Sequence, residues 1–111
     1  MDKVIHYREL ILQVLREHAD LGQSKDNIET EIIHDSVLDH FELSRTGWDD
    51  EHRICGAVIH IDIRNDKIQI QHDGTEPGVA RRLVELGVPK SDIVLAFQSP
   101  FTRQFTEYAV N

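Results

Sequence analysis

The sequence predicts an α+β fold in which an antiparallel sheet of about four to five strands packs against two helices. Apolar residues recur at helical spacing over residues 2–20, and they alternate with polar residues over several segments between residues 28 and 73. A second, shorter helical pattern lies in the C-terminal half. The chain of 111 residues is long enough for one hydrophobic core, so we expect a single domain over residues 1–111.

The first of these segments predicts a long N-terminal helix over residues 2–20. Asp2 suits the N-cap position, and Gly22 suits a C-terminal stop before a loop over residues 22–27. The apolar stripe of this helix comprises Val4, Tyr7, Ile11, Val14 and Leu15, widened by Leu10 and Leu12. A stripe of this width indicates that the helix buries a broad face against the sheet.

Two strands are predicted next, over residues 28–35 and 40–48, because apolar and polar residues alternate in both segments. The link over residues 36–39 closes a hairpin whose tip carries Val37 and Leu38. Hairpin tips are normally exposed to water, so this apolar pair suggests a contact with another part of the chain or with a partner. A second tight connection follows at residues 49–52.

The fold is organised around a hairpin over residues 53–73 with a two-residue turn at Asn65-Asp66, a pair suited to positive φ angles. The predicted register pairs Arg64 with Lys67, Ile63 with Ile68, Asp62 with Gln69, Ile61 with Ile70, His60 with Gln71, and Ile59 with His72. One face of the hairpin is then apolar and the other is polar. A slip of one residue would turn the isoleucines to water, so the hydrophobic pattern fixes the register.

A shorter helix is expected after this hairpin. Thr75 suits the N-cap, Glu76 lies well at the positive end of the helix, and Pro77 suits the first turn. Gly87 ends the helix. The apolar segment over residues 93–97 then predicts a short buried strand.

Hydropathy and cysteine content indicate where the chain resides. No apolar run approaches the roughly 20 residues needed to span a bilayer, and the N-terminus lacks the basic and then apolar pattern of a secretory signal. The single cysteine, Cys55, excludes an internal disulfide and fits a reducing compartment, so we expect a cytoplasmic protein. Its place in a strand indicates a packed cysteine rather than a reactive thiol.

The formal net charge of −8 is carried by the N-terminal part of the chain. Residues 1–63 hold six Lys and Arg against fourteen Asp and Glu, whereas residues 64–111 hold six of each. Because affinity for nucleic acid comes mostly from cations that replace counterions, direct DNA binding is disfavoured. The basic side chains that would have to form a local patch are Arg81, Arg82, Lys90 and Arg103.

The seven histidines do not predict a metal site. Their spacing includes no His-x-x-x-His on one helix and no cysteine at zinc-binding spacing. In the predicted register, His72 lies on the isoleucine face while His60 and Asp62 lie on the opposite face, so these three would not converge. No catalytic or cofactor-binding residue is predicted, because no nucleophile or oxyanion element accompanies the polar residues.

His60, Asp62, Gln69 and Gln71 nevertheless share one face of the predicted hairpin. This arrangement is compatible with a polar pocket or an acid–base pair. It is equally compatible with a hydrogen-bonded sheet face that is either wet or covered by a partner. The second interpretation is favoured, since the face carries no further catalytic group.

The tail over residues 98–111 concentrates aromatic side chains near an arginine. Phe101, Arg103, Phe105 and Tyr108 lie within a few residues of one another. Aromatic residues together with arginine are typical of the anchors of protein interfaces. The same residues also suit a tail that packs on the core of its own chain, and both interpretations remain open.

Several blocks along the chain carry a family resemblance. They are GW at 47–48, GAVIHIDI at 56–63, KIQIQ at 67–71, DGTE at 73–76, LVELGVPK at 83–90, DIVLAF at 92–97 and RQFTEYAV at 103–110. In this order they resemble the cyanobacterial XisI family, and the likeness runs over nearly the whole chain. The family takes its name from a controlling factor for excision of the fdxN element, a DNA segment removed during heterocyst differentiation.

The resemblance implies a XisI-like α+β domain that acts as a cytoplasmic accessory factor in DNA rearrangement, while a separate site-specific recombinase cuts and rejoins the DNA. It implies no catalytic residues, a homo-oligomer, and a protein partner such as a XisH-type protein. The alternative function is that of a DNA-binding regulator of the recombinase. The residues predicted to bind a partner are Trp48, His60, Asp62, Phe101, Arg103, Phe105 and Tyr108.

Overall fold

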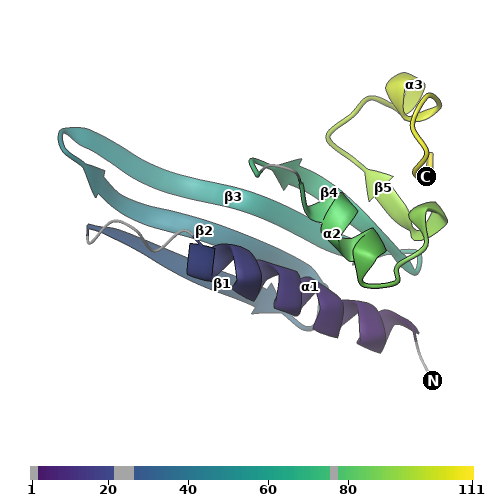
Figure 1. Ribbon diagram of the computed structural model, residues 1–111, viewed down its shortest axis with the longest axis horizontal. Coiled ribbons are helices and arrows are strands. Elements are labelled where there is room, and N and C mark those ends of the chain that lie inside the picture. The colour runs from purple at the N-terminus through teal and green to yellow at the C-terminus, as the bar shows by residue number, and fades with distance from the viewer. Residues whose placement is uncertain (1–2, 22–26, 76–77) are drawn as a thin grey trace.

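The computed structural model describes residues 3–21, 27–75 and 78–111 (Figure 1). Its elements are α1 (Lys3–Leu21), β1 (Ile28–Asp35), β2 (His40–Asp49), β3 (His52–Arg64), β4 (Lys67–Asp73), α2 (Val79–Glu85), the 3-10 turn η1 (Lys90–Asp92), β5 (Ile93–Leu95) and α3 (Pro100–Arg103). The strands form one sheet in the order β1-β2-β3-β4-β5. The predicted α+β class is confirmed, and the first four strands are antiparallel as expected. The fifth strand pairs parallel with β4, which makes the sheet mixed.

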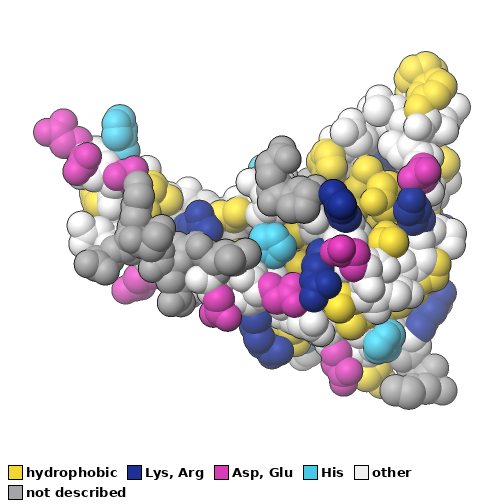
Figure 2. Space-filling view, in the orientation of Figure 1, with side chains coloured by type: hydrophobic (Ala, Val, Ile, Leu, Met, Phe, Trp, Pro, Cys, Tyr) yellow, Lys and Arg dark blue, Asp and Glu magenta, His cyan; other side chains and the backbone are white. Residues whose placement is uncertain are grey.

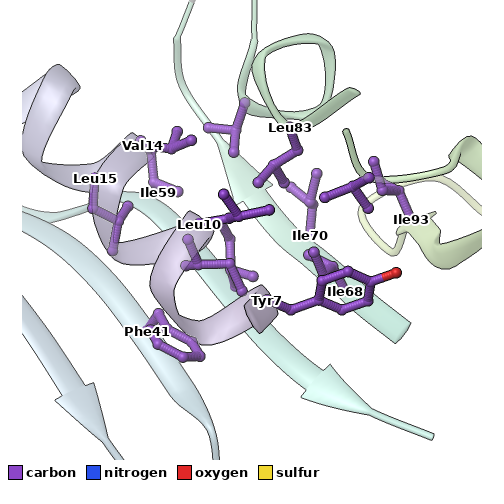
Figure 3. Close-up of a cluster of buried hydrophobic side chains, with 14 of the residues drawn as sticks. Tyr7, Leu10, Val14, Leu15, Phe41, Ile59, Ile68, Ile70, Leu83 and Ile93 are labelled. Atoms are coloured by element: carbon purple, nitrogen blue, oxygen red, sulfur yellow. The ribbon is translucent and has the colours of Figure 1, made fainter. Parts of the chain in front are cut away.

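Both longer helices cover the same face of the sheet, as Figure 1 shows. The core lies between these helices and the sheet, and it contains the predicted stripe of α1 and the isoleucines of the central hairpin (Figure 3). Its fully buried members include Ile11, Leu15, Phe41, Leu43, Ile59, Ile61, Ile68, Ile70, Leu83 and Ile93. Within the described ranges, no helix combines the length and apolarity needed to cross a membrane. The predicted cap Asp2 and stop Gly22 lie outside the described residues.

The turn of the central hairpin has the predicted geometry, with φ angles of 55° at Asn65 and 62° at Asp66. The predicted register is confirmed from this turn as far as the pair of Ile61 with Ile70. Beyond that pair it is wrong by one residue. A bulge leaves Gln71 without a partner residue on β3, as bulges do when they insert one extra residue into a strand.

As a result of this bulge, His60 faces His72 rather than Gln71, and Ile59 faces Asp73 rather than His72. The backbone N–H of Gly74 then donates a 2.8 Å hydrogen bond to the carbonyl oxygen of Val58, so the chain turns away from the sheet at this point.

A second bulge lies in β3, in the part of this strand that pairs with β2. Counting back from the tight turn, where Asp49 pairs with His52, would place Phe41 opposite His60. Such a pairing would set an apolar side chain against a polar one on each face. The extra residue is Val58. Its insertion places Phe41 opposite Ile61 on the apolar face, and it places His40 opposite Asp62 and Glu42 opposite His60 on the polar face.

The start of α2 differs from the prediction. The helix begins at Val79, and the residue at its N-cap position is Gly78, with φ of 112° and no side-chain cap. Asp73 supplies the missing acceptor, since its carboxylate accepts hydrogen bonds from the backbone N–H groups of Thr75 and Val79. The expectation that Thr75 itself caps the helix is therefore wrong, because the helix begins only at Val79 and the N–H of that residue donates to the Asp73 carboxylate. Glu76 and Pro77 lie outside the described residues.

Polar contacts join α1 to the C-terminal half. Arg82 on α2 donates two hydrogen bonds of 2.9 Å to the carboxylate of Glu17 on α1. At the other end of α1, the Tyr7 hydroxyl donates to Asp92, and Lys3 lies 3.4 Å from the same carboxylate. Burial and the Asp92 carboxylate raise the pKa of Tyr7 to about 12, so the phenol remains a donor at neutral pH.

The ion pair between Glu17 and Arg82 leads to a prediction about pH. The Arg82 guanidinium lowers the pKa of Glu17 from 4.5 to about 2. The folded state therefore holds Glu17 ionised where the unfolded chain would protonate it, so the stabilisation is complete above pH 4.5 and disappears as pH falls towards 2. Both side chains are more than a third exposed, which limits the effect to about 1 kcal/mol or less.

We expect Glu17→Gln to lower the free energy of unfolding at pH 6 and to approach the parent chain at pH 3, as measured by urea denaturation at both pH values. Glu9→Gln, on the exposed side of the same helix, serves as the control and should change little at either pH. A Glu17→Gln deficit of equal size at the two pH values would show that the carboxylate charge does not stabilise the helix pair.

The C-terminal segment folds back on β5 and is fastened by one arginine. β5 ends at Leu95 and is therefore shorter than the predicted strand over residues 93–97. Arg103 donates to the backbone carbonyl oxygens of Leu95, Ala96, Gln98 and Val110 at 3.0–3.4 Å. The segment then returns so that Ala109 bridges Val94, with its N–H on the carbonyl oxygen of Ile93 at 2.9 Å.

Candidate functional site

The face of the sheet opposite α1 and α2 carries a cluster of ionisable side chains. We call this surface the open sheet face and define it by His40 and Glu42 on β2, His60 and Asp62 on β3, and Gln69 on β4. His40 pairs directly with Asp62, and Glu42 pairs with His60. Residues that pair across two strands point to the same side of the sheet, so these four side chains meet. Asp62 is the only charged residue on the described part of the chain that is classed as buried, at 4% exposure.

The contacts within this cluster are short. Nδ1 of His40 lies 2.7 Å from Oδ1 of Asp62, and Nε2 of His60 lies 3.1 Å from the same His40 nitrogen. Nε2 of His60 is also 3.5 Å from Oδ1 of Asp62. The second carboxylate oxygen of Asp62 lies 3.5 Å from Arg64. The sequence-predicted pair of His60 and Asp62 therefore lies in one constellation, with His40 between them.

The electrostatics of the cluster centre on His40. Burial disfavours the charged form of this ring, but hydrogen bonds to Asp62 and Glu42 outweigh the burial and raise the pKa of His40. Glu42 lies 3.5 Å from the far ring nitrogen of His40, so carboxylates flank the ring on both sides. The arrangement holds the ring firmly and compensates the buried charge of Asp62.

Sequence reasoning missed His40, although a signal for it was present. Without the bulge at Val58, His40 would face Ile61 and not Asp62. A register without the bulge would pair the apolar Phe41 with His60 and the polar His40 with Ile61. This poor match indicates that one extra residue lies in β3. Placing it there would have brought His40 opposite Asp62, next to the pair of His60 and Asp62 that the sequence already places on one face.

The aromatic residues of the C-terminal segment lie elsewhere and play two different roles. Phe101 and Phe105 are 69% and 75% exposed, and their rings meet edge to face with centroids 5.3 Å apart. We call these two side chains, together with the exposed Phe97 earlier in the same segment, the C-terminal aromatic surface. Figure 2 shows hydrophobic side chains at the outer end of this segment, over the position of α3. Tyr108 instead packs partly buried against the core.

Trp48 lies at a third place. It belongs to the β2–β3 arm, residues 44–57, which extends past α1 at the end of the molecule away from the C-terminus (Figure 1). Its ring is half-exposed and lies under the guanidinium of Arg53, 5.5 Å from the ring centroid. Along β2, Trp48 is eight residues from His40, which corresponds to about 26 Å of strand. The residues predicted to bind a partner thus lie in three separate regions of the fold, and Asp62, Arg103 and Tyr108 among them are engaged within the chain.

Two smaller expectations also have an outcome in the structure. Val37 and Leu38, at the tip of the β1–β2 hairpin, are 87% and 72% exposed, so they make no buried contact within the described part of the chain. Cys55 is a free and exposed thiol, so the expectation of a packed cysteine is wrong. It lies in β3, on the β2–β3 arm.

The basic residues proposed as a patch for nucleic acid are mostly engaged with acceptors of the chain itself. Arg82 forms its ion pair with Glu17, and Lys90 lies 2.6 Å from a carboxylate oxygen of Glu107. Arg103 is committed to four backbone carbonyls. Arg81 is exposed, and the side chains of Arg82 and Lys90 are more than a third exposed. This arrangement gives little support to a cationic binding surface for DNA.

The molecule is thus a two-layer α+β domain, with helices on one face of a mixed five-stranded sheet and an ionisable cluster on the other. The family model for the XisI protein matches residues 1–110, and the chain belongs to the XisI family. A comparison with curated proteins finds no match.

Solved structures agree with this assignment. A XisI-like protein from Anabaena variabilis is 37% identical, with a TM-score of 0.90 over 96% of this chain and 98% of that protein. The fdxN element excision controlling factor XisI from the same organism is 31% identical, with a TM-score of 0.85 over 99% of this chain and 100% of that one.

Proposed function

We propose that this protein is a non-catalytic controlling factor for excision of a DNA element, of the fdxN type, and that it acts by binding a protein partner. The observation that supports the proposal best is the likeness, over the full length of both chains, to the fdxN element excision controlling factor XisI. A controlling role of this kind is regulatory, and recombinase chemistry would reside in another protein. We propose further that the partner is a XisH-type protein and that both act in the cytoplasm.

The C-terminal aromatic surface is the region that we propose for partner binding. Large aromatic side chains lose little conformational freedom on binding, and they dominate the energetics of many interfaces. Phe101 lies on the short helix α3, which begins with a Ser99 N-cap, and Phe105 lies in the turn that follows it, with its N–H on the carbonyl oxygen of Thr102 at 3.1 Å. The acidic net charge and the engaged basic side chains favour a protein partner over DNA.

The test is a co-expression pull-down with a XisH-type protein, followed by calorimetry on the purified pair. We expect a complex at micromolar concentration. Its absence would argue strongly against an accessory role through this partner. A parallel salt titration with duplex DNA tests the alternative function, a DNA-binding regulator of the recombinase; measurable affinity at low salt that falls steeply with added salt would favour it.

We expect the double variant Phe101→Ser, Phe105→Ser to weaken the complex about 30- to 1,000-fold, since interface aromatics commonly contribute about 1–2 kcal/mol each. The control is Val37→Ser, Leu38→Ser, which removes an equally exposed apolar pair at the hairpin tip. Both variants should melt like the parent chain, because none of the four side chains is buried. Equal affinity in the two variants would place the interface elsewhere.

We also propose that copies of the chain associate. The open sheet face and the outer edge of β1 are not covered by other elements within the described residues. Uncovered strand edges and sheet faces are common places for subunits to meet. Sedimentation velocity in reducing buffer tests this directly, and a monomer at all accessible concentrations would exclude it.

A further inference from the structure

The open sheet face carries a group of ligand atoms that the proposed function does not use. Nδ1 of His40, Nε2 of His60 and Oδ1 of Asp62 all lie within 4.8 Å of one another. They come from adjacent strands, which fix their backbone positions through the hydrogen-bonded pairing of β2 with β3. Two imidazoles and one carboxylate are a donor set that suits zinc and related first-row metals.

The spacing of the three atoms matches what a metal ion requires. The atoms form a triangle with sides of 2.7, 3.1 and 3.5 Å. The circumradius of such a triangle is about 1.8 Å, which is shorter than the roughly 2.0–2.2 Å of zinc bonds to imidazole nitrogen and carboxylate oxygen. A point just outside the plane of the triangle therefore lies at bonding distance from all three atoms. The side chains need little rearrangement to coordinate one ion.

The 3.1 Å contact between the two histidine nitrogens competes with the 2.7 Å contact to Asp62 for one proton. If Nδ1 of His40 carries the proton that it donates to Asp62, the same proton serves the 3.1 Å contact with His60 only by being shared. If His60 donates instead, Nδ1 of His40 has no proton for the 2.7 Å contact with Asp62. A cation just outside the plane of the three atoms would accept a lone pair from each of them and remove this competition.

The groups around the three ligand atoms also suit a metal site. Ligating histidines usually donate their other ring N–H to a carboxylate, which orients the ring. Nε2 of His40 lies 3.5 Å from Glu42, so this outer carboxylate is in place. Arg64 lies near the second oxygen of Asp62 and leaves Oδ1 to the ion. Both histidine side chains are about 30% exposed, so further coordination positions are open to water.

We propose that His40, His60 and Asp62 form a binding site for one divalent transition metal ion of the zinc type on the open sheet face. The ligand atoms are Nδ1 of His40, Nε2 of His60 and one oxygen of Asp62, with Glu42 orienting the His40 ring. The site is independent of the C-terminal aromatic surface and of the proposed partner.

The test uses the full chain without a histidine tag and Zn²⁺ alone. Isothermal titration calorimetry should give one ion per chain. Ring ¹H–¹⁵N correlation spectra should show that Zn²⁺ shifts the Nδ1 resonance of His40 and the Nε2 resonance of His60. These are different ring positions on the two residues, which is a signature that random surface binding would not reproduce.

Variants make the assignment specific. We expect His60→Gln and Asp62→Asn each to weaken Zn²⁺ binding by at least about 10- to 100-fold, the loss seen even when an outer partner of a metal site is removed. His72→Ala is the matched control, because this exposed histidine faces His60 on β4 yet is not one of the three ligands, and its affinity should equal that of the parent chain. Circular dichroism of each metal-free variant establishes that it is folded.

The proposal is overturned if the parent chain shows no saturable binding at millimolar Zn²⁺, if folded His60→Gln binds as tightly as the parent, or if the shifted resonances belong to other histidines. In each case the cluster is a hydrogen-bonded network that stabilises the buried Asp62. Because the readouts involve metal and chain alone, they do not depend on whether a XisH-type partner binds.

Discussion

Leu83→Ala is expected to lower the free energy of unfolding by about 3–5 kcal/mol, the range for a large aliphatic side chain removed from a core that cannot close the cavity. Leu83 is fully buried and packs α2 onto the sheet (Figure 3). Domains of this size are stable by only about 5–15 kcal/mol, so the loss removes a large part of the total. It should also loosen β5, since the chain reaches that parallel strand only by way of α2.

Urea denaturation followed by circular dichroism measures this effect. Leu38→Ala is the matched control, because it is the same chemical change at a hairpin tip that is 72% exposed, and we expect it to alter stability by about 0.5 kcal/mol or less. Similar unfolding midpoints for the two variants would mean that α2 does not contribute to the cooperative core.

Arg103→Met is expected to release the C-terminal segment, with a loss of about 2–3 kcal/mol in its local stability, the scale of hydrogen bonds that involve a charged group. The guanidinium of Arg103 donates to carbonyl oxygens on both arms of the folded-back segment. Leu95, Ala96 and Gln98 precede α3, and Val110 follows it. Methionine preserves much of the side-chain volume but provides no donor. The four carbonyls then have to find water instead, and the segment opens.

Chymotrypsin cleavage and hydrogen exchange report this opening. Phe97, Phe101 and Phe105 are exposed, so cleavage after them depends on how readily the backbone unfolds locally. Arg103→Lys retains the charge but lacks the planar fork, and we expect it to behave closer to Arg103→Met than to the parent. Arg81→Met is the control at an exposed arginine. If the parent and Arg103→Met are cut at the same rate, the arginine does not hold the segment.

The fate of Arg103 illustrates what a sequence pattern leaves open. An arginine among aromatic residues is typical of interfaces, and that pattern gave equal weight to an outward and an inward role. The path of the backbone assigns the inward role to Arg103 and the outward role to two of the aromatic residues. Because the segment folds back, four carbonyl oxygens lie within reach of the Arg103 guanidinium, while Phe101 and Phe105 remain exposed. Nothing in the local sequence encodes this path, because it depends on the pairing of Ala109 with Val94.

Local rules predicted most of the fold. The Asn65-Asp66 turn and the alternation of isoleucines were sufficient for the central hairpin near its turn, because both act over a few residues. The two bulges were not predicted, and they control which polar side chains meet. The candidate metal cluster depends on the bulge at Val58, because this extra residue in β3 is what places His40 opposite Asp62. That pairing was not predicted, since the predicted strands did not include the extra residue.

The exposed thiol on the β2–β3 arm has a practical consequence for all of these experiments. Cys55 is the chain's only cysteine, and Figure 1 places its arm at the far end of the molecule from the C-terminus. A maleimide dye therefore attaches at one defined position and leaves the aromatic segment unmodified, which allows fluorescence anisotropy to follow complex formation. In air, the same sulfur can join two molecules covalently and imitate self-association, so Cys55→Ser is the appropriate background for measuring subunit number.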